Sequence, residues 1–248
     1  MLVDTHCHIH EADYPIEVAE VLAGAKEASV DVMICVGTSI ESSRQAVLFA
    51  GAHSATRASI GVHPHDTKDG YKPIEELVTA PGVVAVGEIG LDYFYNHSPK
   101  EVQIEALKWQ IELALAHNLP IIFHVRDAFD DFWPIFDSYS GIRGVLHSFT
   151  DSQENLEKAI ERRLMIGVNG ISTFTKNSEQ QRLYASIPLT SLLLETDAPF
   201  LTPAPFRGNV NQPAFVQYVA KHHATIRDIS IDDVARATTA NATALFAL

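Results

Sequence analysis

The stretch 83–91, VVAVGEIGL, is an apolar and β-branched run that contains a single charged residue, Glu88. Near-continuous apolar strands of this kind are typical of parallel sheets that are covered on both faces. Seven further runs follow the same pattern, at 2–9, 30–38, 57–64, 119–127, 142–150, 164–172 and 192–199. Successive runs begin 22 to 36 residues apart, which leaves room for one helix after each strand.

Capping boxes, in which a Ser or Thr precedes an acid or Gln by three positions, predict where three of these helices begin. The boxes and their helices are Ser98 to Glu101 for 98–117, Thr150 to Gln153 for 150–163, and Ser230 to Asp233 for 230–246. The first helix has an amphipathic stripe made of Val102, Ala106, Trp109, Leu113 and Ala116. Eight strand–helix units in 248 residues predict a single (β/α)8 barrel of the TIM type over 1–248. A doubly wound open sheet alternates in a similar way, so the count of elements does not decide alone.

Polar residues at the ends of the runs favour the closed barrel. These residues are His6, His8, His63, Glu88, His124, His147 and Asp197. A buried strand that otherwise excludes polar groups pays a desolvation cost for each one. In a barrel the carboxyl ends of all strands surround one mouth, whereas an open sheet separates its first and last strands. We therefore expect a barrel with a metal site at the carboxyl ends of its strands.

The pattern His6-Cys7-His8 is the sharpest local signal. Residues two apart on a strand point to the same face, so both imidazoles can converge while Cys7 faces the other way. Neutral imidazole is the commonest protein ligand for metals, although two ordinary histidines remain the simpler reading of this pattern alone. The two cysteines, Cys7 and Cys35, lack the paired spacing of a zinc finger. Cys7 as a nucleophile is the other alternative, and its outward phase favours packing.

Charge and composition exclude several classes of protein. With 31 acidic and 18 basic residues, the formal net charge is −13, which argues against coating a polyanion by bulk charge. The chain begins without a signal-peptide pattern, has two cysteines and contains no apolar run of membrane-spanning length. We expect a cytoplasmic protein with no membrane contact, and no obligatory protein partner is evident. The sequence also has no interleaved basic and aromatic patch that would suggest a base-stacking surface.

Motifs spread along the chain resemble those of the TatD family of metal-dependent deoxyribonucleases, in the amidohydrolase-like barrel group. The matching stretches are DTHCH at 4–8, GVHPH at 61–65, GEIGLDY at 87–93, HVRDA at 124–128, HSFT at 147–150 and ETDAP at 195–199, with Arg207, Gly208, Asn211, Pro213 and Asn241 in the tail. They keep the family's order and cover nearly the whole chain. Asp151 stands where a Gly is usual, and Asn209 and Gln212 replace charged residues of the tail motif. These departures concern the outer substrate surface and remove no ligand.

The resemblance implies two divalent ions, for which Mg²⁺, Mn²⁺ and Zn²⁺ all suit the mixed ligands. His6, His8 and Asp197 would hold one ion together with Glu88. Glu88 would also bridge to a second ion held by His124 and His147. Related enzymes often use a carboxylated lysine as the bridge, and the fourth run contains no lysine. His63 and His65 would contact either substrate phosphate or a third ion.

Further residues are expected around this centre. Arg126 shares the face of His124 and is a candidate phosphate contact, with a structural ion pair as the alternative. Arg207 lies in the long proline-rich stretch 199–213, which we expect to form a wall for substrate, and it is a second candidate phosphate contact. Asp92 could fix a ligand by accepting a hydrogen bond from it.

The resulting expectation is a metal-dependent exodeoxyribonuclease. A metal-activated water would hydrolyse DNA phosphodiester bonds at a strand end, with Asp197 and Glu88 as the catalytic residues. The same centre would also suit hydrolysis of a small-molecule ester, lactone or amide, because one barrel hosts many chemistries. A non-catalytic metal-binding protein or docking subunit is a third possibility, against which the complete ligand set argues.

Overall fold

The computed structural model describes residues 1–95 and 97–248, and its eight strands form one sheet in the order β1 to β8. The strands are β1 (Leu2–Cys7), β2 (Val30–Val36), β3 (Thr56–Ile60), β4 (Val83–Asp92), β5 (Ile121–Arg126), β6 (Gly144–Leu146), β7 (Met165–Val168) and β8 (Leu192–Leu194). The last strand leads back to the first: the Asp197 amide donates to the His6 carbonyl at 2.8 Å, and Cys7 pairs with Ala198 in parallel. A parallel sheet whose first strand meets its last is the predicted (β/α)8 barrel fold.

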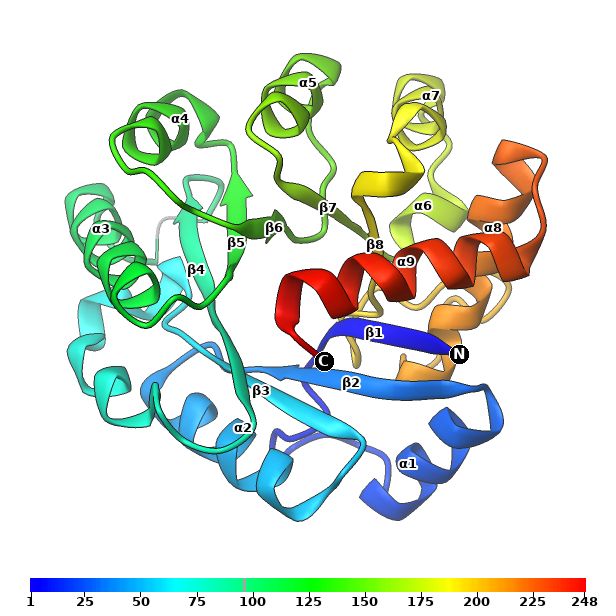
Figure 1. Cartoon of the computed structure of the whole chain (residues 1–248), viewed down its shortest axis with the longest axis horizontal. Coiled ribbons are helices and arrows are strands. Elements are labelled where there is room, and N and C mark those ends of the chain that lie inside the picture. Colours follow the sequence, from blue (N-terminus) through cyan, green and yellow to red (C-terminus); the bar gives the residue numbers. More distant parts are fainter. Residues whose placement is uncertain (96) are drawn as a thin grey trace. The chain divides into compact units, whose positions relative to one another are not determined.

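The chain divides into two compact units. The first unit comprises residues 1–34 and 148–248, and the second unit comprises residues 35–147. In the second unit α2 (Ile40–Ala52), α3 (Lys100–Ala116) and α4 (Phe129–Asp137) lie outside the strands, together with the 3-10 helices η1 (Pro64–Asp69) and η2 (Lys72–Leu77) (Figure 1). Buried side chains from β3, η2 and α3, such as Ile60, Ile74 and Ala106, form one core cluster there.

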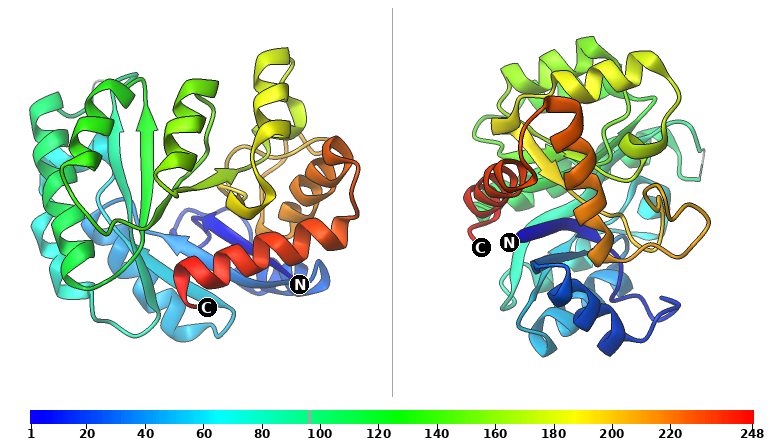
Figure 2. Two further views of the ribbon diagram at one scale, coloured as in Figure 1. Left: turned by 45° about the horizontal axis from the view of Figure 1, so that its top comes forward. Right: turned by 90° about the vertical axis from the view of Figure 1, so that its right-hand side faces the viewer.

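The first unit contains the other helices. They are α1 (Val18–Glu27), α5 (Gln153–Glu161), α6 (Ile171–Phe174), α7 (Ser178–Ser186), η3 (Leu189–Ser191), η4 (Pro213–Phe215), α8 (Val216–Arg227) and α9 (Ile231–Phe246). The long α9 packs across β1 and β8 and also contacts α8 (Figure 2). Asn241 of α9 donates to the carbonyls of Leu189 and Leu192 at 2.9 Å, which fixes the start of β8. Among the described residues no helix combines the length and the apolar composition that crossing a membrane requires.

The helix starts are only partly as predicted. Ser230 caps α9 as expected, accepting from the Asp233 amide at 3.0 Å. The box at Ser98 is wrong, because α3 begins after Pro99 and the Ser98 hydroxyl instead donates to the His65 carbonyl at 2.6 Å. The box at Thr150 is also wrong, because Ser152 is the residue that caps α5.

The buried face of α3 differs from the predicted stripe. Ala106 and Leu113 are buried as expected, but Ala116 is exposed, and two glutamines, Gln103 and Gln110, are buried instead. The Gln110 amide exchanges hydrogen bonds with both backbone groups of Val62, at 2.8 and 3.2 Å. Because its oxygen and its nitrogen are both hydrogen-bonded, this buried side chain joins α3 to the segment after β3 with little desolvation penalty.

Several strands end earlier or later than the sequence suggests. β3 ends at Ile60, so His63 lies three residues beyond it and caps η1. β4 continues to Asp92, so Glu88 lies inside the strand rather than near its end. The register with β5 shifts between Val86 and Ile89, which places Glu88 in a bulge. Bulges of this kind re-aim a side chain, and this one accounts for a buried acid within an apolar strand.

Candidate metal centre

His6, His8 and Asp197 form a cluster in the first unit. The Nε2 atoms of His6 and His8 lie 3.2 Å apart, and they lie 3.6 and 3.3 Å from Oδ1 of Asp197. His6 is fully buried and His8 nearly so, whereas the Asp197 side chain is 15% exposed. The alternation of β1 therefore brings both imidazoles to one carboxylate, as the His-x-His spacing predicts.

The backbone around Asp197 is held in a conformation that is unusual for a residue with a side chain. Asp197 has φ of 59°, in the left-handed region, which Asp tolerates better than most residues. Its backbone amide donates to the His6 carbonyl, and the neighbouring Thr196 carbonyl accepts from the Asn211 side-chain nitrogen, Nδ2, at 2.7 Å. Asn211 also donates to the Phe200 carbonyl at 2.6 Å, so the loop after β8 is fastened to the strand end.

Asp4 connects β1 to the Asp197 segment through hydrogen bonds. Its carboxylate accepts from the Thr196 hydroxyl at 2.6 Å, from the Thr196 amide at 2.9 Å and from the His6 amide at 3.3 Å. Burial raises the pKa of Asp4 well above its ordinary value, although these hydrogen bonds oppose the shift. Asp4 therefore positions both His6 and Asp197 without belonging to their cluster.

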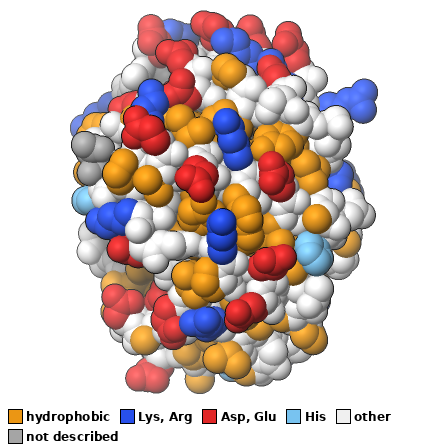
Figure 3. Space-filling view, turned by 90° about the vertical axis from the view of Figure 1, so that its left-hand side faces the viewer, with side chains coloured by type: hydrophobic (Ala, Val, Ile, Leu, Met, Phe, Trp, Pro, Cys, Tyr) orange, Lys and Arg blue, Asp and Glu red, His pale blue; other side chains and the backbone are white. Residues whose placement is uncertain are grey.

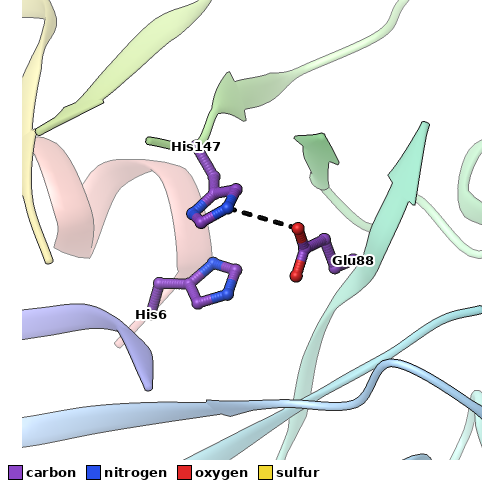
Figure 4. Close-up of side chains that lie close together, drawn as sticks. All are labelled: His6, Glu88 and His147. Atoms are coloured by element: carbon purple, nitrogen blue, oxygen red, sulfur yellow. Dashed lines mark ion pairs between the residues drawn. The ribbon is translucent and has the colours of Figure 1, made fainter. Parts of the chain in front are cut away.

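Glu88, His124 and His147 form a second cluster, in the second unit. Oε1 of Glu88 lies 2.8 Å from Nδ1 of His124 and 3.2 Å from Nε2 of His147; Figure 4 draws the latter pair. His147 directly follows β6, and its amide donates to the Phe123 carbonyl of β5 at 3.0 Å. Burial alone would lower the pKa of His124, but hydrogen bonds to Asp92 and Glu88 outweigh it and raise that pKa.

Asp92 contacts the ring nitrogen of His124 that does not contact Glu88. Its Oδ2 atom is 3.0 Å from Nε2 of His124 and 3.0 Å from Nε2 of His65. Its Oδ1 atom accepts from the amides of Phe94 and Tyr95 at 3.0 and 3.1 Å. Burial opposes its ionisation, yet the hydrogen bonds from His124 and the Tyr95 amide hold the pKa of Asp92 below its usual range. Asp92 thus accepts from a candidate ligand, as the sequence suggests.

His63 and His65 lie beside this second cluster. The His63 ring is 4.3 Å from the His65 ring and 4.4 Å from the His124 ring, measured between centroids. Burial, and then the nearby His124, lowers the pKa of His63 well below its ordinary value. The His65 amide donates to Nδ1 of His63 at 3.2 Å, so the neutral ring carries its proton on Nε2. Nε2 lies 3.7 Å from Oε1 of Glu88.

The donor atoms suit divalent metal ions. Ligand atoms about 2.1 Å from one ion lie roughly 3.0 Å apart in octahedral geometry and roughly 3.4 Å apart in tetrahedral geometry. The separations within the first cluster, 3.2 to 3.6 Å, and those around Glu88, 2.8 and 3.2 Å, match these spacings. His63, Asp92 and His124 form another group whose ligand atoms lie close enough to share one ion. Imidazole and carboxylate ligands fit Mn²⁺, Zn²⁺ and Fe²⁺ and permit Mg²⁺.

The two predicted phosphate-binding arginines both lie on aromatic rings. The Arg126 guanidinium carbon is 3.9 Å from the centre of the Phe94 ring, and that of Arg207 is 3.8 Å from the centre of the Phe174 ring. Arg207 also donates to the Thr202 carbonyl at 2.8 Å. Arg126 is exposed at the end of β5, so its guanidinium remains accessible to an anion.

Some residues that support the clusters escape sequence reasoning. Gln103 accepts from the Asp92 amide at 2.9 Å and donates to the Asp92 carbonyl at 3.1 Å. In the first unit, the buried Glu195 accepts from the Ser148 amide at 2.6 Å, and a side chain at Gly167 would collide with it. The ETDAP and HSFT motifs contain Glu195 and Ser148 but do not show that these residues bind each other. A buried glutamine on a helix carries no linear signal at all.

Comparison with known proteins places the chain in a family. The family model described as TatD related DNase matches residues 3–247. The chain is 37% identical over 252 residues to a Bacillus subtilis protein named uncharacterized metal-dependent hydrolase YabD, covering 99% of both. It is 35% identical over 241 residues to the 3'-5' ssDNA/RNA exonuclease TatD of Erwinia amylovora, covering 92% of this chain and 93% of the other.

A solved structure agrees with the sequence comparisons. The crystal structure of YJJV, a TatD homolog from Escherichia coli K12, superposes with a TM-score of 0.93 at 29% identity, covering 100% of this chain and 98% of that chain. The barrel topology, the ligand clusters and the full-length matches agree with one another. The chain therefore belongs to the TatD related DNase family of metal-dependent hydrolases.

Proposed function

We propose that this hydrolase cleaves phosphodiester bonds of DNA, starting from the end of a single strand. The observation that carries the proposal is the pair of ligand clusters, His6 with His8 and Asp197, and Glu88 with His124 and His147. The name of the Erwinia amylovora relative, a 3'-5' ssDNA/RNA exonuclease, supports this substrate class. Each cluster would hold one divalent ion, with Glu88 shared between the two ions.

The barrel fold supports a shared centre. In (β/α)8 enzymes the active site lies at the carboxyl ends of the strands, and every proposed ligand lies in or just after a strand. When bound, divalent ions supply Lewis-acid stabilisation of the phosphoryl oxygens and lower the pKa of bound water. Asp197 would orient the attacking water and accept its proton, because its side chain is the most accessible carboxylate of the proposed ligands.

Neighbouring side chains would bind the phosphate. His63 stays neutral near pH 7 because its pKa is lowered, and its Nε2–H can donate to a phosphoryl oxygen. Arg126 offers an accessible guanidinium, which suits the geometry of a phosphate. Arg207, held by Phe174 and Thr202, would provide a second cation from the loop after β8.

The charge of the molecule favours a short contact with substrate. On the face drawn in Figure 3, acidic and basic side chains are interspersed. With a net charge of −13, the chain is poorly suited to gripping a long duplex by counter-ion release. Local positive charge from metal ions and a few arginines would instead hold one strand end.

The substitution Asp197→Asn tests the proposal. The variant should keep its circular dichroism spectrum and lose roughly 100- to 10,000-fold in kcat, because the proton acceptor is gone. Asp228→Asn is the matched control, since Asp228 has φ of 53°, close to the 59° of Asp197, and caps α8 at the surface. The substrates are end-labelled single- and double-stranded DNA and RNA, each with Mg²⁺, Mn²⁺ or Zn²⁺, and a simple carboxylic ester.

The product ladder and the substrate preference then distinguish an exonuclease from a hydrolase of small esters. Stepwise shortening from one end of DNA supports an exonuclease. Turnover of the ester without turnover of any oligonucleotide by metal-loaded protein would refute the nuclease proposal. Equal turnover of Asp197→Asn and wild type would refute the role of Asp197.

A further inference from the structure

The loop between β4 and α3 places two aromatic rings in solvent. Phe94 is 54% exposed and Tyr95 is 45% exposed, although large apolar side chains are usually buried. Their ring centroids lie 4.7 Å apart with the planes at 83°. The Arg126 guanidinium lies 3.9 Å from the Phe94 ring centre and 5.0 Å from the Tyr95 ring centre. A basic group and two half-exposed aromatic rings are therefore gathered at the end of β5, with Arg126 over one face of Phe94 and the His97 ring stacked on Tyr95 at 5.7 Å between centroids.

This aromatic cluster, Phe94 with Tyr95 and Arg126, lies next to the histidines of the second unit. The Tyr95 ring meets the edge of the His65 ring, with centroids 5.6 Å apart and planes at 87°. The His65 ring is in turn 4.3 Å from the ring of His63. Successive phosphates of a stacked strand rise about 3.4 Å along its axis. The two ring separations, 4.3 and 5.6 Å, span at most about three such rises, so a base within about three nucleotides of a phosphate at His63 would reach the rings.

Hydrogen bonds hold Tyr93, Phe94 and Tyr95 in place. The Asp92 carboxylate accepts from the Phe94 and Tyr95 amides, as described above. The Tyr93 hydroxyl donates to Asp131 at 2.9 Å, and Lys100 forms an ion pair with the same carboxylate at 2.6 Å. Residues 93–95, held in this way, lose little further entropy when a ligand binds to the two rings.

We propose that Phe94 and Tyr95 form a stacking surface for a nucleobase beside the scissile phosphate, while Arg126 binds a phosphate of the same strand. The proposal rests on the proposed nuclease function and adds a base-binding subsite to it. Aromatic rings with a nearby arginine bind single strands without strong sequence preference, because every base has a π-face. A base inside a duplex is stacked on both sides by its neighbours, so this subsite favours unpaired bases over paired ones.

A purely supporting role for the rings makes a different prediction. If Phe94 only holds Arg126 in place, its loss weakens binding of phosphate whether or not a base is attached. If Phe94 stacks on a base, its loss matters only for substrates that have that base. The two roles separate when the base is removed from the substrate and the phosphodiester backbone is kept.

The experiment uses two end-labelled single-stranded DNA oligonucleotides of equal length, one unmodified and one with tetrahydrofuran abasic residues over its last three positions at either end. Phe94→Ala should raise KM for the unmodified strand by about 5- to 150-fold with little change in kcat, and should change KM for the abasic strand less than about twofold. Phe94→Leu keeps apolar bulk but lacks a π-face, and should behave like Phe94→Ala. Tyr139→Ala is the control and should leave both KM values unchanged. Tyr139 follows the C-terminal end of α4, whereas Arg126 precedes its N-terminal end.

Binding of the same oligonucleotides, followed by fluorescence anisotropy, keeps the two proposals separable. Equal losses on the unmodified and abasic strands in Phe94→Ala, or wild-type behaviour in Phe94→Leu, would overturn the stacking surface. If wild-type protein binds the unmodified strand more tightly than the abasic strand but cleaves neither, the nuclease proposal fails and the subsite stands. If it cleaves both strands equally well and binds them equally, the nuclease stands and the subsite fails.

Discussion

Replacing Asp92 with asparagine should weaken metal binding through His124. In the wild type Oδ2 of Asp92 accepts from Nε2 of His124, which leaves Nδ1, the atom 2.8 Å from Glu88, available to face a metal. In the Asp92→Asn variant the new side-chain amide nitrogen would take the place of Oδ2 and donate to Nε2. His124 would then carry its proton on Nδ1, on the side where the ligand atom is needed.

Two independent estimates of the size of the effect agree. The loop should be little affected, because the asparagine side-chain oxygen can still accept from the Phe94 and Tyr95 amides. The interaction lost is one hydrogen bond to a charged group, about 1.5–3 kcal/mol. Removing a carboxylate that orients a metal-bound histidine typically weakens metal affinity about 10- to 100-fold, or roughly 1.4–2.7 kcal/mol.

Isothermal titration of metal-free protein with Mn²⁺ or Zn²⁺ measures this directly. Asp131→Asn is the matched control. Asp131, in α4, is also a carboxylate that holds this region, because it accepts from the Tyr93 hydroxyl and pairs with Lys100. We expect Asp131→Asn to keep wild-type affinity for every bound ion. Unchanged affinity in Asp92→Asn, with intact secondary structure, would refute both the tautomer argument and the role of His124 as a ligand.

Three other predictions concern stability. Arg227 donates to Nδ1 of the buried His223 at 2.7 Å, and burial followed by Arg227 lowers the pKa of His223 well below its ordinary value. The unfolded chain therefore binds more protons than the folded chain, so the free energy of unfolding should fall as pH drops below about 6.5. In urea titrations this fall should be smaller for the His223→Gln variant than for wild type. A fall of equal size in the variant would contradict the role of His223. A Cβ at Gly90 would lie 1.7 Å from the His124 carbonyl oxygen, so Gly90→Ala should lower the free energy of unfolding in urea by about 3 kcal/mol. Gly51 lies in α2 with open space around it, so Gly51→Ala should raise the free energy of unfolding by about 0.5–1 kcal/mol. Compared with protein in metal at 100 times its Kd, protein treated with a chelator should melt at a temperature roughly 5–11 °C lower. Adding metal back should restore the melting temperature. An unchanged melting temperature would argue against specific binding of metal to the folded state.

The fold was largely predictable because it depends on patterns that are repeated eight times. Apolar runs separated by helix-length segments indicate parallel strands whatever their exact ends, and polar residues at those ends favour closure. The ends themselves were less predictable. Glu88 lies in a bulge inside β4, and Ser98, which resembles a helix cap, binds the His65 carbonyl instead. Such choices are made by tertiary partners that a local pattern does not contain.

The site shows the same division between local and distant information. His6 and His8 share a face because alternation along a strand is a local property. Phe94 and Arg126 are 32 positions apart (126 minus 94), so their contact has no linear signature. Register between β4 and β5 brings them together, since Asp92 pairs with Arg126. The interleaved basic and aromatic patch absent from the sequence is thus formed in the structure by strand pairing.

The two oxygens of Asp92 serve different partners, and this has a thermodynamic consequence. One oxygen holds the amides of Phe94 and Tyr95, and the other meets His124. Any shift of the loop that accompanies oligonucleotide binding is therefore transmitted to a candidate metal ligand through a single carboxylate. Coupling between two binding equilibria is reciprocal: the factor by which bound metal changes oligonucleotide affinity is also the factor by which oligonucleotide changes metal affinity. If bound metal raises the affinity for an oligonucleotide, a bound oligonucleotide therefore tightens the binding of metal by the same factor.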